Sequence, residues 1–184
     1  MSEQMQNQNK SDKQSTLVSS AYDWVGAAVI ALVVVSILFS LFFRVVNVSG
    51  DSMTNTLQNG EKLFLSGIFA SPDYGDIVVI RRDNDTPLIK RVIGLPGDKI
   101  FIDDVDGKVY RNGEELVEPY TRDGFTPSRG METYTVPEDG IFVLGDNRRE
   151  SLDSRNLGDN IKMKDVVGVV TFRLNPFQSL RKGD

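Results

Sequence analysis

The sequence predicts a mainly β protein: an antiparallel sheet or barrel-like domain with few short helices, preceded by one N-terminal transmembrane helix. Beyond about residue 44, the chain consists of short segments rich in Val, Ile, Phe and Tyr, separated by Gly, Asp, Asn and Pro. Helix signals there are few, and a chain of 184 residues suits one domain of ordinary size. An uninterrupted apolar run before this region predicts the membrane helix.

Residues 1–21 precede the apolar run and are rich in Gln, Asn, Ser and Lys. Such a segment cannot bury enough apolar surface to offset the entropy that folding costs. We therefore expect a disordered tail.

The transmembrane segment is predicted over 22–43, and its core is an uncharged run from Trp24 to Phe43. At about 1.5 Å per residue, a helix of this length spans the roughly 30 Å hydrocarbon core of a bilayer. A cleaved signal peptide has an apolar core of about 7–15 residues followed by a small-residue cleavage site, and a buried core helix usually keeps a polar face. Since the run fits neither alternative, we expect an uncleaved anchor.

The charges that flank this segment do not orient it. Lys10 and Lys13 precede the span, whereas Arg44 and Lys62 follow it closely. The positive-inside count is therefore close to a tie.

The region 44–184 is the third predicted domain, and strands dominate it. Asn112-Gly113 is a strong hairpin signal because both residues accept a positive φ, and Asp106-Gly107 is a weaker one. Short strands at this spacing favour an antiparallel barrel or folded sheet. The predicted strands are Arg44–Val48, Lys62–Leu65, Asp76–Ile80, Leu88–Ile93, Lys99–Ile102, Lys108–Tyr110, Thr133–Val136, Ile141–Leu144 and Val166–Leu174.

Two short helices are predicted in this domain. Ser52 is a suitable N-cap for a first one, and Ser151–Asn156 is the second.

The composition excludes several chemistries. The chain has no cysteine and no histidine, so disulfides, Cys/His zinc sites and any nucleophile activated by imidazole are excluded. A general base would have to be Lys, Asp, Glu or Tyr. The net charge of −5 argues against a sequence-independent nucleic-acid binder.

We expect no metal and no cofactor. The sequence contains neither a phosphate-binding loop nor a dinucleotide-binding fingerprint. The acidic residues Asp103, Asp104 and Asp106 lack the spacing and the closing Glu of a calcium loop, which favours a solvated turn.

Three segments carry candidate chemistry, and the first is Ser49–Leu57. A serine in a Gly-flanked turn, such as Ser52, has an accessible hydroxyl, and nearby N–H groups can point at a developing oxyanion. The alternative is that Ser52 only caps the turn, as serines commonly do.

The second segment is Lys90–Asp98. On a strand, Leu88, Lys90 and Val92 share one face, so Lys90 is a candidate for burial. Burial lowers the pKa of a lysine and makes the neutral amine available as a base. The alternative is a lysine whose stem covers apolar surface while its charge stays in water, and spacing alone does not decide. Gly94–Asp98 is a strong turn signal.

The third segment is Gly145–Arg155, which follows an apolar strand. Asp146, Asp153, Arg148 and Arg155 are able to form a fixed ion-pair network, and Ser151 to orient another side chain. The alternative is a solvated charged loop, in which exposed pairs contribute only about 0–1 kcal/mol.

Together, in this order behind an anchor, these segments resemble bacterial type I signal peptidases, the Ser/Lys peptidases of family S26. The resemblance rests on Ser52-Met53, on Lys-Arg-Val-Ile-Gly-Leu-Pro-Gly-Asp from Lys90, and on Gly-Asp-Asn-Arg and Ser-Leu-Asp-Ser-Arg from Gly145 and Ser151. The segments 74–80 and 106–120 are similar as well, so the resemblance extends to about residue 173. A single span and a compact domain resemble the short, Gram-positive type.

The resemblance implies roles for individual residues. Ser52 matches the nucleophile, Lys90 the general base and Ser151 the residue that orients the lysine. Gly50 falls where some members place an oxyanion-hole serine, so the Ser52 N–H would do more of that work here.

Asp146, Asp153 and Arg155 match the supporting network of the family. Asn55 departs from the pattern, because the family usually has proline there, and Pro pre-sets φ in a turn. The departure puts the rigidity of the turn in doubt more than catalysis.

The resemblance also implies a function and a topology: a membrane-anchored serine endopeptidase that cleaves signal peptides from exported preproteins with small residues at −1 and −3. The tail would be cytoplasmic and the domain 44–184 extracytoplasmic, at the cell membrane. Phe64, Ile68 and Phe69 are candidates for an apolar rim that enters lipid, with core packing as the alternative.

Two other functions are compatible with the sequence. One is a related Ser/Lys protease that acts on itself or on a dedicated substrate. The other is a membrane-tethered β-domain that binds a partner without catalysis, in which a serine-reactive probe would label nothing at Ser52.

Overall fold

The computed structural model describes residues 22–40, 43–66, 71–83 and 85–180. The predicted tail 1–21 lies outside these residues, as do Ile68 and Phe69. The chain divides into two units, residues 1–41 and 42–184, which are taken in turn.

In the first unit the structure describes the helix Tyr22–Ser40, which is long and apolar enough to cross a membrane. All of its residues are exposed, which is not the pattern of a helix in a soluble core. The predicted segment extends to Phe43, but Phe43 is instead the first residue of a strand.

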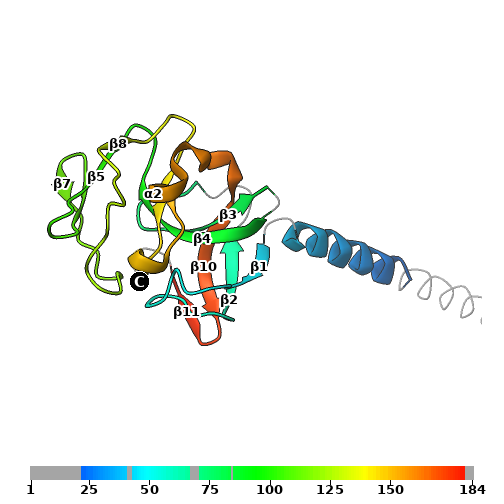
Figure 1. Cartoon of the computed structure of the whole chain (residues 1–184). Coiled ribbons are helices and arrows are strands. Elements are labelled where there is room, and N and C mark those ends of the chain that lie inside the picture. The colour runs from blue at the N-terminus through cyan, green and yellow to red at the C-terminus, as the bar shows by residue number, and fades with distance from the viewer. Residues whose placement is uncertain (1–21, 41–42, 67–70, 84, 181–184) are drawn as a thin grey trace, which may run out of the picture. The chain divides into compact units, whose positions relative to one another are not determined.

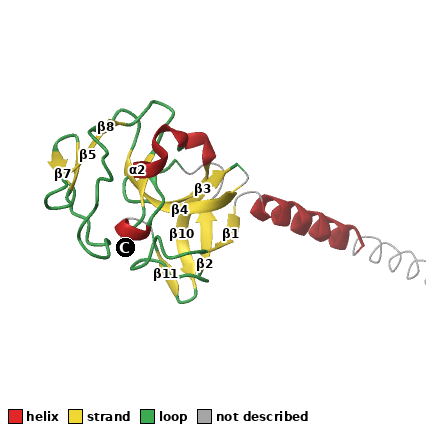
Figure 2. Ribbon diagram, in the orientation of Figure 1, coloured by secondary structure: helices red, strands yellow, loops and turns green. Residues whose placement is uncertain are grey.

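The second unit is built from two antiparallel sheets, so the predicted mainly β class is confirmed (Figures 1 and 2). The larger sheet has the strand order β1-β2-β10-β3-β4-β9, and β11 pairs with β10. Its strands are β1 Phe43–Asn47, β2 Lys62–Ser66, β3 Ile77–Arg82, β4 Asp85–Gly94, β9 Phe142–Leu144, β10 Val166–Leu174 and β11 Phe177–Ser179.

The smaller sheet has the order β7-β6-β5-β8. Its strands are β5 Lys99–Ile102, β6 Val109–Arg111, β7 Glu114–Glu115 and β8 Tyr134–Thr135. The Asn112-Gly113 hairpin joins β6 to β7 with positive φ at both residues, as the sequence predicts.

Strand β4 is central to the domain because its residues enter three apolar clusters. Ile89 packs with residues of β2 and β3, Val92 with the other face of β3, and Ile93 with residues of the smaller sheet. The turn predicted over 94–98 then leads from β4 into β5: the Asp98 N–H donates to the Leu95 carbonyl, and Gly97 has a φ of +85°.

Helices in this unit are short. The helix predicted to begin at Ser52 is wrong: residues 51–56 form hydrogen-bonded turns, and Asn55 has a φ of +105°, outside the helical region. The second predicted helix is present in part as α2, Ser154–Leu157, which Asp153 caps. Single 3-10 turns cover Arg148–Glu150 (η1), Gly158–Asn160 (η2) and Met163–Asp165 (η3).

Candidate active site

The turn that contains Ser52 packs on the hydrophobic core. The neighbouring side chains of Met53 and Leu57 are buried in the cluster that β2 and β3 line, whereas Ser52 itself is only half-buried. The backbone closes through bonds from Thr54 to Asp51 and from Leu57 to Met53, of 3.0 and 2.8 Å. The turn is therefore anchored in the core, while the hydroxyl of Ser52 lies at the surface.

Lys90 is buried on β4, with 2% of its surface exposed. Its Nζ lies 2.7 Å from Ser52 Oγ and 2.8 Å from the carbonyl oxygen of Ile89. Burial lowers the pKa of Lys90 to about 8, although Asp153 and Asp146 favour the charged form. Of the two alternatives from the sequence, burial is confirmed and the solvated lysine is excluded.

Asp146 follows β9 and contacts both the turn that contains Ser52 and strand β4. Arg91 donates to both of its oxygens, with Nε–Oδ1 and Nη2–Oδ2 distances of 2.9 and 2.6 Å. The Thr56 hydroxyl donates to Oδ2 over 2.5 Å. This buried group joins the strand that carries Lys90 to the turn that carries Ser52.

Asp153 and Arg155 form a second buried pair, bidentate at 2.9 and 2.8 Å. Burial alone would raise the pKa of Asp153, but Arg155 reverses the shift and holds it below its usual value. Asp153 also accepts the Gly145 N–H, so the carboxylate fixes the start of the 145–151 loop.

Arg148 differs from the sequence expectation. Its guanidinium pairs with Glu118, at 2.7 and 2.8 Å, and contacts Thr126. It joins the Asp153–Arg155 pair only through its carbonyl oxygen, which accepts from Arg155 Nη2. The expected four-residue network is therefore divided among separate partners.

Ser151 is buried, and its hydroxyl interacts with the Asp153 carboxylate, whose pKa it helps to lower. The hydroxyl lies against the Cα of Gly145, where any Cβ would collide with it and with the Ser52 carbonyl oxygen. The hydrogen bonds of Lys90 go to Ser52 and to the Ile89 carbonyl, so an orienting role of Ser151 stays a prediction.

Gly50 lies two residues before Ser52 and has a φ of +90°, a value that favours glycine. Its N–H donates to Asn59 Oδ1 over 3.1 Å. Because this donor is engaged, the Gly50 N–H is not available to an oxyanion at this position.

A cleft of about 290 Å³ lies beside Ser52 and Lys90. Val48, Met53, Leu88 and Ile89 give it apolar walls, and Arg82 adds a cation. The cleft therefore combines polar groups with apolar side chains next to the hydroxyl and the amine.

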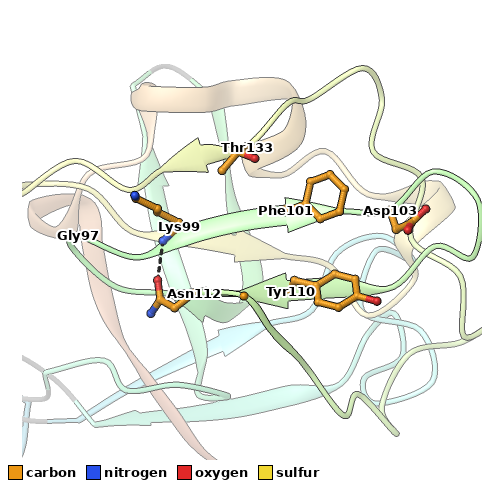
Figure 3. A pocket seen from close by; sticks show the side chains of 8 residues that line it. Gly97, Lys99, Phe101, Asp103, Tyr110, Asn112 and Thr133 are labelled. Carbon is orange, nitrogen blue, oxygen red and sulfur yellow. Dashed lines mark hydrogen bonds between the residues drawn. The ribbon is translucent and has the colours of Figure 1, made fainter.

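A larger hollow of about 650 Å³ lies on the smaller sheet (Figure 3). Phe101 and Tyr110 stand side by side in it, with ring centres 5.9 Å apart, and Lys99 donates its N–H to Asn112 Oδ1. None of the site residues predicted from the sequence lines this hollow.

Several residues of the site were missed by sequence reasoning. Arg91 received no role from its place next to Lys90, because its partner Asp146 is 55 positions away in the chain. Thr56, Asn147 and Glu118 lie within the segments discussed above, but no sequence pattern assigned a role to any of them. Among the described residues, no group of three or more acidic side chains is placed to hold a metal ion.

Comparisons with known proteins agree with this geometry. The family described as "Signal peptidase, peptidase S26" matches residues 21–175. The chain is 36% identical to a signal peptidase I of Bacillus amyloliquefaciens, over 94% of this chain and 98% of that one. It is also 36% identical to signal peptidase I S of Bacillus subtilis (strain 168), over 97% and 99%.

A crystal structure of a signal peptidase I from Enterococcus faecalis V583 is 32% identical and covers 56% of this chain and all of that one, with a TM-score of 0.46. The family match and the relatives' coverage confirm the resemblance to the Gram-positive type I enzymes. The chain therefore belongs to the signal peptidase family, peptidase S26, and is a serine peptidase.

Proposed function

We propose that this protein removes signal peptides from exported preproteins, with Ser52 as the nucleophile and Lys90 as the general base. The observation that carries the proposal is the 2.7 Å contact between Ser52 Oγ and the buried Lys90 Nζ. A base must lie within hydrogen-bond reach of the proton it takes, and its pKa must lie near the working pH. Lys90 meets both conditions.

The reaction begins when neutral Lys90 takes the proton of Ser52 Oγ, which attacks the carbonyl carbon at the cleavage site. The oxyanion of the tetrahedral intermediate accepts a hydrogen bond from the Ser52 N–H. Its collapse breaks the peptide C–N bond, and Lys90 gives its proton to the leaving amine. Lys90 then takes a proton from water, which hydrolyses the acyl-enzyme and releases the signal peptide, while Ser52 regains its proton.

The supporting roles follow from the contacts. Asp146 holds the Lys90 strand and the Ser52 turn together through Arg91 and Thr56, and the Asp153–Arg155 pair fixes the loop that packs on them. Ser151 is proposed to contact Lys90 during the reaction, because its hydroxyl is buried and interacts with Asp153, whose charge also acts on Lys90. Gly50 leaves the oxyanion to the Ser52 N–H.

Substrates are expected to have small residues at −1 and −3. The support is the family match, together with the apolar side chains of Val48, Met53 and Leu88 that line the cleft next to the nucleophile.

The lipid bilayer is the proposed second partner, and the segment 22–43 is the proposed anchor. Beyond the helix Tyr22–Ser40, one face of the larger sheet supports this proposal. Val45, Phe64 and Phe172 lie opposite one another on β1, β2 and β10, and Phe177 stacks on Phe172. Val45 and Phe177 are 55% and 72% exposed, which suits contact with lipid. We further propose a cytoplasmic tail and an extracytoplasmic domain 44–184.

A preprotein assay tests the proposed function. The purified full chain in detergent is mixed with a preprotein, beside Ser52→Ala and Lys90→Ala variants. We expect both variants to lose cleavage, since positioned proton transfer alone contributes about 10²–10⁴-fold. Ser71→Ala and Lys99→Ala, at exposed positions, are the matched controls and should cleave as the parent does.

Equal cleavage by all five proteins would contradict the Ser/Lys assignment. Mass spectrometry that finds self-cleavage while preproteins stay intact would instead favour a protease with itself as substrate.

A further inference from the structure

Asn147 contacts both peptide groups that flank Ser52. Its backbone N–H donates to the Ser52 carbonyl oxygen over 3.0 Å. Its side-chain Nδ2 donates to the Asp51 carbonyl oxygen over 3.1 Å. Asn147 is 2% exposed, so both bonds come from a residue that the fold holds in place.

These two bonds constrain the direction of the Ser52 N–H. In a trans peptide, the carbonyl of Asp51 and the N–H of Ser52 lie in one plane and point in opposite directions. A donor fixed on that carbonyl therefore fixes the direction of the N–H. The bond to the Ser52 carbonyl fixes the following peptide plane, so the backbone is held on both sides of the nucleophile.

The side-chain bond also affects the strength of the donor. Hydrogen bonds polarise one another along a chain, so a carbonyl that accepts a bond makes the N–H of the same peptide a better donor. The Gly50 N–H is engaged with Asn59 Oδ1, so it does not compete with the Ser52 N–H for the oxyanion.

We propose that Asn147 is a positioning residue, which acts through the Asp51–Ser52 peptide to aim and polarise the Ser52 N–H at the oxyanion. This inference rests on the proposed function. It assigns to the side chain of Asn147 a role separate from the general base, because its bond goes to the Asp51 carbonyl and not to the Ser52 hydroxyl or to Lys90.

The first test is the preprotein assay with Asn147→Ala, which removes Nδ2 and keeps the backbone N–H. Loss of one oxyanion donor costs about 10²–10³-fold in kcat, and a misdirected donor should cost about 10- to 100-fold. KM and the midpoint of the pH profile should stay unchanged, because substrate binding and Lys90 are untouched. Asn156→Ala is the matched control: Asn156 is exposed on α2 and contacts Arg129.

The second test does not depend on activity. Asp-Ser occurs at 51–52 and 153–154, so labelling Asp carbonyls with ¹³C and Ser amides with ¹⁵N gives an NMR signal for each of these peptides in the full chain in detergent. Asn147→Ala should move the amide proton of Ser52 and leave that of Ser154 in place. The Ser52→Ala variant assigns the signals.

The proposal requires both changes, and either one without the other overturns it. Unfolding of both Asn147→Ala and Asn147→Asp also overturns it, because the residue would then support the fold as a whole. If the unaltered protein fails to cleave preproteins, the proposed function fails whatever Asn147 does. If it cleaves and Asn147→Ala cleaves equally, only the inference about Asn147 fails.

Discussion

Lys90 combines burial with an amine that has to lose its proton to act. Because its pKa is lowered to about 8, an appreciable share of the folded molecules holds the neutral base near neutral pH. Activity should therefore rise as the pH passes through about 8 and level off above it. The rate constant for preprotein cleavage, measured between pH 6 and pH 10, checks this expectation, and a profile without a rise in that range would contradict Lys90 as the base.

The same burial should cost stability. Below pH 8 the folded protein holds a buried ammonium that the unfolded chain would hold in water. Between pH 8 and the ordinary pKa of 10.5, the folded state binds fewer protons than the unfolded state, so this cost is relieved as the pH rises. One pKa unit corresponds to about 1.4 kcal/mol, so the cost at pH 7 is on the order of 3 kcal/mol.

Lys90→Met should consequently be inactive yet at least as stable as the parent at pH 7. Its advantage should shrink as the pH approaches 10.5. Denaturant unfolding of both proteins at pH 7 and pH 10 measures the difference. An advantage that grows with pH would show that desolvation of the ammonium is not the dominant effect.

Asn55 tests the conformation of the serine turn. Its φ of +105° is open to glycine and closed to proline, whose ring holds φ near −65°. Asn55→Gly should therefore change the free energy of unfolding by less than about 1 kcal/mol, whereas Asn55→Pro should cost about 3 kcal/mol or more and lower cleavage.

Thermal unfolding and preprotein cleavage of both variants measure this contrast. Full activity and stability of Asn55→Pro would mean that the turn adopts the conformation expected for the proline-containing pattern of the family.

At the scale of elements, a buried ion pair joins η1 to a loop that precedes it in the chain. Arg148 on η1 is 2% exposed at its side chain and Glu118 is 9% exposed, so their pair is largely shielded from water. It links the segment before residue 120 to the loop that contains Asn147. Burial makes such a pair costly to break from one side and cheap to replace as a unit.

A double-mutant cycle on this pair should reveal that asymmetry. Arg148→Met and Glu118→Gln should each cost about 3–5 kcal/mol, because each leaves a buried charge without its counter-charge. The double variant should cost less than the two single changes added together. Denaturant unfolding of the four proteins measures the coupling, and additive losses would contradict it.

Regular elements with strong local patterns were predictable from sequence. Strands Lys99–Ile102 and Val166–Leu174 match their predicted limits, because alternation and β-branched residues specify them locally. Strands β7 and β11 were missed, since two or three residues carry too little pattern. The N-cap signal at Ser52 is local and predicts a helix, whereas the contacts that shape the turn come from Asp146 and Asn147, far along the chain.

The candidate site was predictable only in part for the same reason. Ser52 and Lys90 are 38 positions apart, and no spacing in the chain announces their contact. Alternation on β4 made the burial of Lys90 a candidate, but it described Arg91 equally well. The partners of Arg91 and Arg148 lie in other segments of the chain. The local charge pattern therefore resembles that of a solvated loop, although both arginines form buried ion pairs.

At the scale of the whole molecule, the chain combines an apolar helix with a domain that carries a water-consuming reaction. Hydrolysis of the acyl-enzyme needs water at Ser52, so the domain 44–184 has to face an aqueous compartment. The near-tie in flanking charges left the direction of insertion open. The proposed orientation places the tail inside the cell and the domain outside.

The absence of cysteine from the chain makes this orientation directly measurable. A single cysteine introduced by Val105→Cys would stand at a position that is 91% exposed, and one introduced by Gln6→Cys would lie in the tail. In intact cells, a membrane-impermeant maleimide should label Val105→Cys and leave Gln6→Cys unlabelled. After permeabilisation both should react, which controls for the accessibility of the tail. Labelling of Gln6→Cys alone in intact cells would contradict the proposed topology. It would not affect the proposed cleavage activity, which the assay on purified protein tests separately.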